Sequence, residues 1–174
     1  MTHIHSFVPI SGPNPRLLIL GSMPGKASLA AGEYYAHPRN AFWEILAELY
    51  GFDPGADYAD RCQVLISQGV AVWDVLKTCT RSSSLDSDIV ESSIVANDLP
   101  GFLLLHASIE RIFFNGAKAE QIFTRHVLPR LDDSHSALPR MRLPSTSPAN
   151  ASVSLTQKRK AWTVLNTALV TTET

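Results

Sequence analysis

The sequence RLLILGSMPGKAS, at residues 16–28, predicts the first strand of a parallel sheet and the turn that follows it. Four consecutive apolar residues at 17–20 are typical of a central strand that is buried on both faces of a parallel sheet. This strand runs directly into Gly21, Pro24 and Gly25, which indicate a tight turn where backbone comes close to a ligand. The stretch therefore predicts a ligand-binding turn at the carboxyl end of the first buried strand.

The turn has a partial likeness to the phosphate-binding loop of nucleotide hydrolases, G-x-x-x-x-G-K-[ST]. That pattern requires a glycine where this chain has Leu20, and a hydroxyl residue after Lys26 where it has Ala27. Pro24 also lacks a backbone N–H group that such a loop directs at phosphate oxygens. We therefore predict that the turn suits a flat base held by backbone better than a phosphate held by Lys26.

The length and composition are those of a globular protein. With 174 residues, 45% of them hydrophobic, we expect one domain over residues 1–174 with an irregular lead-in at 1–15. The formal net charge of −1 means that any contact with nucleic acid must use local basic clusters. No leader peptide or membrane-length apolar run is read, so we expect a cytoplasmic monomer that binds no membrane and needs no protein partner.

Short apolar runs alternate with helical patterns along the chain. This alternation predicts an α/β protein, a three-layer α/β/α sandwich around a mainly parallel sheet of four to five strands. The predicted strands cover residues 17–20, 70–72, 112–114 and 141–143, and the predicted helices cover 41–50, 99–107, 118–127 and about 154–170. Ligands of such sheets bind beyond the carboxyl ends of the strands. Three polar segments fall there, at residues 21–28, 115–116 and 144–150.

Residues 32–43, GEYYAHPRNAFW, carry the highest density of functional groups in the chain. Loops that mix aromatic, imidazole, guanidinium and carboxamide groups often form binding sites. The same residues also have structural interpretations, because Tyr35 can pack in the core, His37 can bond to backbone and Asn40 can cap a helix. Each of these residues taken alone favours the structural interpretation.

Two further segments carry groups that could contact a nucleic acid. Asn115 follows a predicted strand, and its carboxamide can donate and accept at once, as the edge of a nucleobase requires; it can equally be a turn residue before Gly116. Ser145, Ser147 and Asn150 lie in the segment PSTSPAN, a stiff loop whose donors suit phosphate or sugar, although Ser/Pro connectors of this kind are common.

Other catalytic patterns are missing from the sequence. Cys62 and Cys79 do not form a C-x-x-C pair, no histidine pair has metal-binding spacing, and no G-x-S-x-G elbow occurs. We therefore expect neither a metal nor another cofactor. The basic run at residues 158–160 is either a solvated helix face or a contact for a DNA backbone.

Taken in this order, the segments resemble the uracil-DNA glycosylase superfamily. The turn at residues 21–25 resembles its first motif, residues 35–43 resemble a segment of the mismatch-specific branch, Asn115 resembles the base-reading asparagine, and residues 144–150 resemble the second motif, which presses on DNA. The resemblance spans about residues 16–165. Within the superfamily, the chain most resembles the branch of hypoxanthine-DNA glycosylases. Members of that branch are described as removing hypoxanthine, the deamination product of adenine.

The resemblance implies a monofunctional DNA repair glycosylase. Such an enzyme hydrolyses the N-glycosidic bond of a deaminated base flipped out of DNA and leaves an abasic site; hypoxanthine is the first expectation, uracil and xanthine the others. Uracil-specific branches place an Asp, and the mismatch branch an Asn, in the first turn to activate water, where this chain has Ser22 and Met23. We therefore expect Asn40 to hold the water, and we do not expect strong uracil excision.

The remaining roles follow from the same hypothesis. Tyr35 would stack on the flipped base, Asn115 would hydrogen-bond its edge, and Ser22 and Met23 would contact it from the turn. Ser145, Ser147 and Asn150 would bind the DNA. Two alternatives stay open at this point, namely an enzyme acting on free nucleosides or nucleotides and a DNA-lesion-binding module without catalysis.

Overall fold

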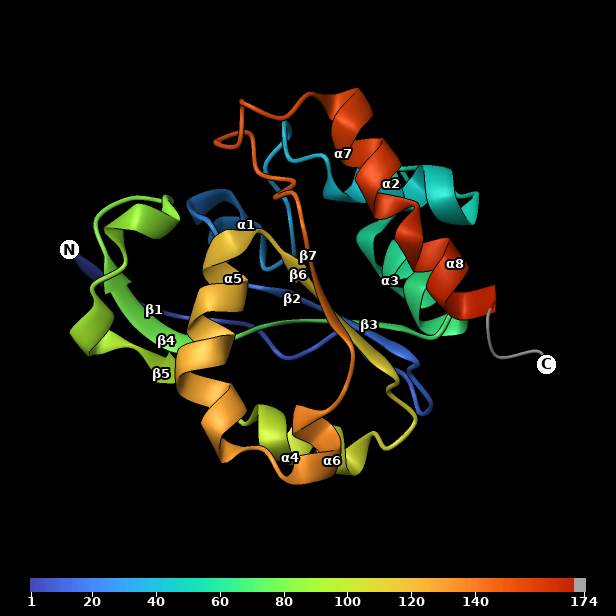
Figure 1. Ribbon diagram of the computed structural model, residues 1–174. Helices are drawn as coiled ribbons and strands as arrows, with labels where there is room; N and C mark the ends of the chain where they lie inside the picture. Colours follow the sequence, from blue (N-terminus) through green and yellow to red (C-terminus); the bar gives the residue numbers. More distant parts are fainter. Residues whose placement is uncertain (171–174) are drawn as a thin grey trace.

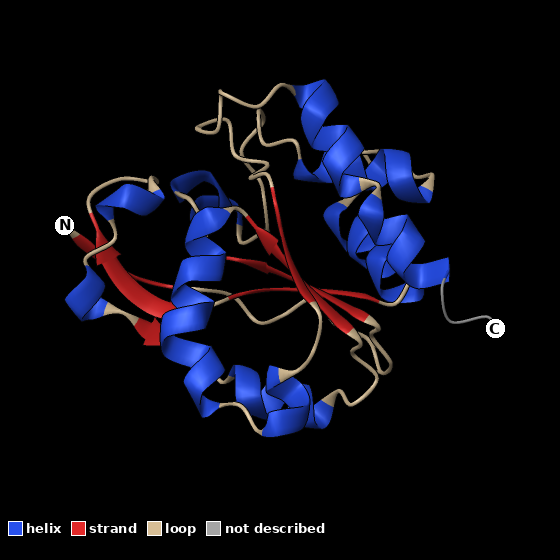
Figure 2. Cartoon of the chain, viewed as in Figure 1, coloured by secondary structure: helices blue, strands red, loops and turns tan. Residues whose placement is uncertain are grey.

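A four-stranded parallel sheet lies at the centre of the computed structural model, which describes residues 1–170 (Figures 1 and 2). Its strands are β2 (Leu17–Gly21), β3 (Val70–Asp74), β6 (Arg111–Asn115) and β7 (Arg140–Leu143), in the order β3-β2-β6-β7. β2 pairs with β3 and β6 in parallel register. The predicted strands and their parallel arrangement are confirmed, and the four carboxyl ends meet at one edge of the sheet.

Helices cover both faces of this sheet, as the sandwich prediction requires (Figure 1). One face carries α2 (Phe42–Tyr50), α3 (Tyr58–Ser67), α7 (Leu155–Trp162) and α8 (Val164–Val170). The other carries α4 (Leu99–Leu105) and α5 (Ala117–Ile122), which continues into a π-helical turn at Phe123–Val127. Two short helices, α1 (Lys26–Ala31) and α6 (Asp133–Ser136), lie in connections.

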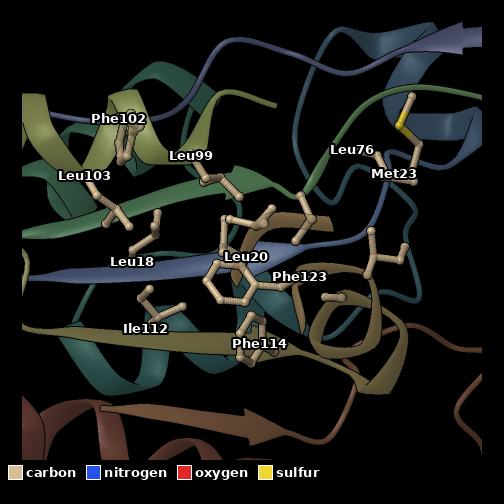
Figure 3. Close-up of a cluster of buried hydrophobic side chains, with 14 of the residues drawn as sticks. Leu18, Leu20, Met23, Leu76, Leu99, Phe102, Leu103, Ile112, Phe114 and Phe123 are labelled. Carbon is tan, nitrogen blue, oxygen red and sulfur yellow. The ribbon is translucent and has the colours of Figure 1, made fainter. Parts of the chain in front are cut away.

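Alternation along the buried strands divides the core into two clusters. Leu18 and Leu20 point to the side of α4 and α5, where they meet Phe114 of β6 and Phe123 (Figure 3). Leu17 and Ile19 point to α2 and α7 on the opposite face. Because successive side chains of a strand point to opposite faces, a strand that is apolar at every position fills both clusters.

A second, antiparallel sheet corrects the predicted irregular lead-in. β1 (Thr2–His5), β4 (Leu76–Arg81) and β5 (Val95–Ala96) form it in the order β1-β4-β5. β1 alternates polar residues with a single apolar one, so its sequence lacks the apolar periodicity by which a strand is recognised. β4 begins two residues after β3 ends, and it carries the chain from the central sheet toward the turn that follows β2.

The helix predicted over about 154–170 is two helices in the structure, so its prediction as one continuous helix is wrong. It begins as predicted at a capping box, in which Ser154 Oγ accepts from the Gln157 N–H at 3.2 Å and Gln157 Oε1 accepts from the Ser154 N–H at 2.9 Å. It is then interrupted at Thr163, which separates α7 from α8. The helix predicted over 99–107 ends at Leu105, and its predicted cap is present, since Asp98 accepts from the Gly101 N–H at 3.0 Å.

The capping box yields a stability prediction. Ser154→Ala removes the acceptor for the Gln157 N–H, and loss of such a cap costs about 1 kcal/mol of unfolding free energy. Urea denaturation should show this loss. Thr156→Ala, an exposed position in the same helical turn, is the matched control and should leave stability within about 0.5 kcal/mol of the parent. Equal midpoints for the two variants would contradict the cap.

Candidate active site

One cavity of about 1050 Å³ opens at the carboxyl ends of the central strands. It is lined by the turn after β2, the segment before α2, the end of β3, the loop at residues 84–87, the end of β6 and the loop after β7. All eight site residues predicted from the sequence line it: Ser22, Met23, Tyr35, Asn40, Asn115, Ser145, Ser147 and Asn150. Segments that are far apart in the chain therefore share a single site.

Thr146 joins three of these segments. Its Oγ1 accepts from Asn115 Nδ2 at 2.9 Å, and its N–H donates to Asn115 Oδ1 at 2.9 Å. Its carbonyl oxygen accepts from the Ala41 N–H at 3.0 Å. Thr146 is 1% exposed, so these bonds are made away from water and hold the loop at 144–150 against the end of β6 and the start of α2.

This junction uses part of the Asn115 carboxamide. One Nδ2 hydrogen and one Oδ1 lone pair are taken by Thr146, which leaves one of each for a ligand. Asn115 is itself 9% exposed and lines the cavity. The residue thus has a structural function that the sequence alone did not indicate.

Asn40 lies at the entry to α2 and combines two functions. Its Oδ1 accepts from the Phe42 N–H at 3.0 Å, and its own N–H donates to the His37 carbonyl at 2.9 Å. These bonds fix the carboxamide at the cavity wall. The N-cap of α2 is Ala41, so the interpretation of Asn40 as the cap is wrong by one residue; its bond to the Phe42 N–H is a turn contact just before the helix. The second lone pair of Oδ1 and the Nδ2 hydrogens remain for a molecule in the cavity.

The turn after β2 presents backbone rather than side chains. Ser22 Oγ donates to Asp86 Oδ1 at 2.6 Å, and the Met23 side chain, 7% exposed, packs in the core (Figure 3). The Pro24 carbonyl accepts from the guanidinium of Arg81. With both side chains engaged elsewhere, Ser22 and Met23 can meet a ligand through backbone groups.

Tyr35 is held in a conformation uncommon for a residue other than glycine. Its φ is 55°, in the left-handed region, and its ring stacks on Phe42 with the centroids 4.0 Å apart and an interplanar angle of 22°. Phe42 covers one face of the ring, so the other face is the one on which a base could stack. Burial raises the pKa of Tyr35 well above its ordinary value, aided by the nearby Asp74, so its hydroxyl stays protonated.

The loop at 144–150 is stiffened by bonds to its own side chains. Ser145 Oγ accepts from the Ser147 N–H at 3.2 Å, and Asn150 Nδ2 donates to the Ser145 carbonyl at 3.2 Å. Behind the loop, Lys158 is 6% exposed and its Nζ donates to the Ser147 carbonyl at 3.2 Å. Such a loop keeps its exposed donors in place without needing a ligand to order them.

The basic run at 158–160 does not form a free cationic face. Lys158 is buried against the loop, and burial lowers its pKa. Arg159 pairs with Glu44 and, at 3.1 Å, with Glu48, both from α2. Lys160 is the exposed member of the run, so a contact with the DNA backbone would depend on that residue, and the run as a whole is not a solvated face.

Sequence reasoning missed Asp74, at the floor of the cavity. It ends β3 opposite Gly21 and is 3% exposed, and its Oδ2 has no hydrogen-bond partner among the described residues. Burial raises the pKa of Asp74 to about 7; the nearby Asp86 adds to this rise, and Arg81 opposes it. The predicted strand stopped at Val72, two residues early, so the carboxyl was not placed at the edge where ligands bind.

Asp86 and Arg81 contact the turn after β2, through the Ser22 hydroxyl and the Pro24 carbonyl. Arg81 is 3% exposed, and burial lowers the pKa of its guanidinium. Burial raises the pKa of Asp86, while the Ser22 hydroxyl and Arg81 oppose that rise. Within residues 1–170, no group of three His, Cys, Asp or Glu side chains is arranged to hold a metal, and no helix is long and apolar enough to cross a membrane.

Comparison with known proteins agrees with this geometry. Two proteins named hypoxanthine DNA glycosylase, one from Methanosarcina barkeri and one from Methanosarcina acetivorans, are each 32% identical over 114 residues, covering 65% of this chain and 71% of theirs. A solution NMR structure of a protein from Methanosarcina acetivorans, described as a candidate uracil DNA glycosylase, superimposes with a TM-score of 0.79. It is 27% identical and covers 96% of this chain and 99% of its own.

A family model matches nearly the whole chain. The model describes the uracil DNA glycosylase superfamily, and it matches residues 8–166, which include every segment that lines the cavity. The chain therefore belongs to the uracil DNA glycosylase superfamily.

Proposed function

We propose that this protein removes hypoxanthine from DNA by hydrolysing its N-glycosidic bond, as a monofunctional glycosylase that leaves an abasic site. The observation that carries the proposal is the single cavity shared by Asn40, Tyr35 and Asn115. Membership of a glycosylase superfamily supports the reaction class, and the names of the two relatives support the choice of base. Uracil and xanthine are the secondary substrates.

The target base has to leave the duplex before it can enter the cavity. Enzymes that act on a base flip the nucleotide into a pocket and stack it against aromatic side chains. The cavity, at about 1050 Å³, is at the upper end of the size of ligand pockets, about 300–1000 Å³, and has room for a purine and its sugar. Tyr35 offers the ring face that Phe42 leaves open, and such stacking contributes about 1–3 kcal/mol per base.

Asn40 is the group we assign to the attacking water. Its carboxamide is fixed by the Phe42 N–H, so its remaining lone pair has a defined direction. A carboxamide takes no proton near neutral pH, so Asn40 orients water rather than deprotonating it. The bond then breaks through an oxocarbenium-like sugar, and the rate comes from position and electrostatics. We therefore expect a modest excision rate, and a pH profile without a step that arises from Asn40.

The departing base takes the electron pair of the glycosidic bond and becomes negative. Backbone groups of the turn at 21–25 and the free part of the Asn115 carboxamide line the cavity and can donate to the base as this charge develops. The loop at 144–150 contacts the DNA strand beside the flipped nucleotide through Ser145, Ser147 and Asn150. Because these internal bonds already order the loop, it loses little conformational entropy when DNA binds.

Incubation with labelled duplexes tests the activity. Duplexes carrying hypoxanthine, uracil or xanthine should give strand scission after alkali, with hypoxanthine processed fastest and undamaged adenine untouched. Free deoxyinosine serves as the control substrate for the small-molecule alternative, and tight lesion binding without scission would indicate the non-catalytic module. Absence of scission on all three lesion duplexes would contradict the enzyme assignment.

A pair of variants separates the two functions of Asn40. Asn40→Ala should reduce single-turnover excision by about 100-fold or more, the scale of a lost water-positioning group, and should also lose the bond to the Phe42 N–H. Asn40→Ser keeps an oxygen acceptor for that N–H but has no carboxamide. Its unfolding midpoint should stay near the parent while excision stays low. An active Asn40→Ser variant would show that the carboxamide holds no catalytic water.

A further inference from the structure

Two buried polar groups, the Asp74 carboxyl and the Tyr35 hydroxyl, lie next to Gly21 at the wall of the cavity. A Cβ placed on Gly21 would lie 2.5 Å from Asp74 Oδ1 and 2.9 Å from the Tyr35 hydroxyl, so glycine leaves room for both groups. Asp74 Oδ2 has no hydrogen-bond partner among the described residues, and the Tyr35 hydroxyl lies beside the Asp74 carboxyl and the Asn115 side chain. Buried polar groups are ordinarily paired, so an unpaired oxygen of a buried carboxyl that lines the cavity indicates a ligand that supplies its partner.

The surroundings of Asp74 favour its neutral form. The charged and titratable groups around it are Asp86 and Arg81, from β4 and the loop after it, with Tyr34 and Tyr35 from the segment before α2. Burial and Asp86 disfavour a second negative charge, which outweighs the single cation. A base that fills the cavity would remove the remaining water and favour the neutral acid further.

A neutral carboxyl and the edge of hypoxanthine are complementary. The protonated group places an O–H donor beside a carbonyl acceptor. Hypoxanthine places an N1–H donor beside the acceptor O6, so the two edges can form a pair of parallel hydrogen bonds. An ionised carboxylate would instead direct one of its two acceptors at O6. Adenine presents an acceptor at N1 and an amino donor at C6, so it can pair only with the reversed arrangement, in which the carboxyl donates to N1 and accepts from the amino group.

We propose that Asp74 reads the flipped base as a neutral acid, accepting a hydrogen bond from N1–H and donating one to O6. This inference rests on the proposed function and specifies how its substrate is recognised. As the glycosidic bond breaks, its electron pair passes to the base and part of the charge reaches O6. The O–H···O6 bond then strengthens in the transition state, while the proton stays on Asp74.

The test is the pH dependence of single-turnover hypoxanthine excision between about pH 5 and about pH 9. The parent rate should be highest in the acidic half of this range and fall about tenfold per pH unit once Asp74 ionises. Asp74→Asn keeps one donor and one acceptor, so it should retain roughly a tenth or more of the parent rate at its maximum and show no such fall. Asp74→Ala should lose about 100-fold or more relative to the parent's maximum and should show no such fall with pH.

Controls make each outcome decisive. Asp60→Asn, an exposed carboxyl of α3, should reproduce the parent profile. An Asp74→Asn protein that is folded but inactive would show that the ionised carboxyl is needed, and one that keeps the parent's fall with pH would remove Asp74 from the titration; either overturns the proposal. If the parent excises no deaminated base, the proposed function itself fails. If the parent is active and only the Asp74 pattern is missed, the failure concerns Asp74 alone.

Binding provides a readout that does not depend on chemistry. Fluorescence anisotropy with a duplex carrying 2′-fluoro-deoxyinosine, whose glycosidic bond resists cleavage, should show parent affinity weakening as pH rises through the same range. Asp74→Asn should bind with an affinity independent of pH there. A duplex with N1-methylhypoxanthine, which lacks the N1–H donor, should bind no better than undamaged DNA. If the parent protein binds the methylated and unmethylated lesions with equal affinity, Asp74 does not accept a hydrogen bond from N1–H and the proposal is overturned.

Thermal unfolding tests the protonation state without DNA. The pKa of Asp74 is raised from 3.8 to about 7 in the folded protein, so the folded state holds a proton that the unfolded chain releases in this window. Parent stability should therefore fall as pH rises through that window. Asp74→Asn removes this loss, so its melting temperature should exceed the parent's above the window and match it more closely at the acidic end. A difference independent of pH would contradict a neutral Asp74.

Discussion

The hydrogen bonds of Thr146 are the constraint on which the cavity depends. One buried residue connects Asn115 at the end of β6 with Ala41 at the start of α2, through the loop that follows β7. Without this connection, the loop at 144–150 would be an ordinary surface segment, and Asn40 and Asn115 would be held by separate elements. Because the bonds are shielded from water, their geometry is well defined, and it places the carboxamides of Asn40 and Asn115 on the same cavity.

The chemistry of the site follows from a lack of strong bases in the first turn. The Ser22 hydroxyl donates to Asp86, and the Met23 side chain lies in the core, so the turn contributes shape and backbone donors. In the proposed mechanism, positioning of water replaces proton abstraction, and Asn40 is the residue that we assign to it. Acidity is concentrated instead at Asp74 and Asp86, beside one buried arginine, where burial disfavours the charged carboxylates. That arrangement supports the proposed role of Asp74 as a neutral partner of the base rather than as a group that deprotonates water.

Sequence patterns predicted the parts of the fold that depend on apolar periodicity. The strand at 17–20 and the capping box at Ser154 were found because burial on both faces and reciprocal capping leave direct signals. β1 was missed because its polar residues show no such signal, and Asp74 because the strand before it was ended at Val72. All predicted site residues line the cavity, yet the bonds from Thr146 to Asn115 join residues 31 positions apart, and no local pattern encodes such a contact.

A crystal structure of the protein with a duplex carrying 2′-fluoro-deoxyinosine tests the central claim most directly. The account predicts one extruded hypoxanthine in the cavity, with Tyr35 on its ring face, its six-membered edge within hydrogen-bond distance of Asp74, and the loop at 144–150 against the DNA strand. A duplex bound on another face of the molecule, or a base in the cavity with its six-membered edge directed away from Asp74, would contradict it.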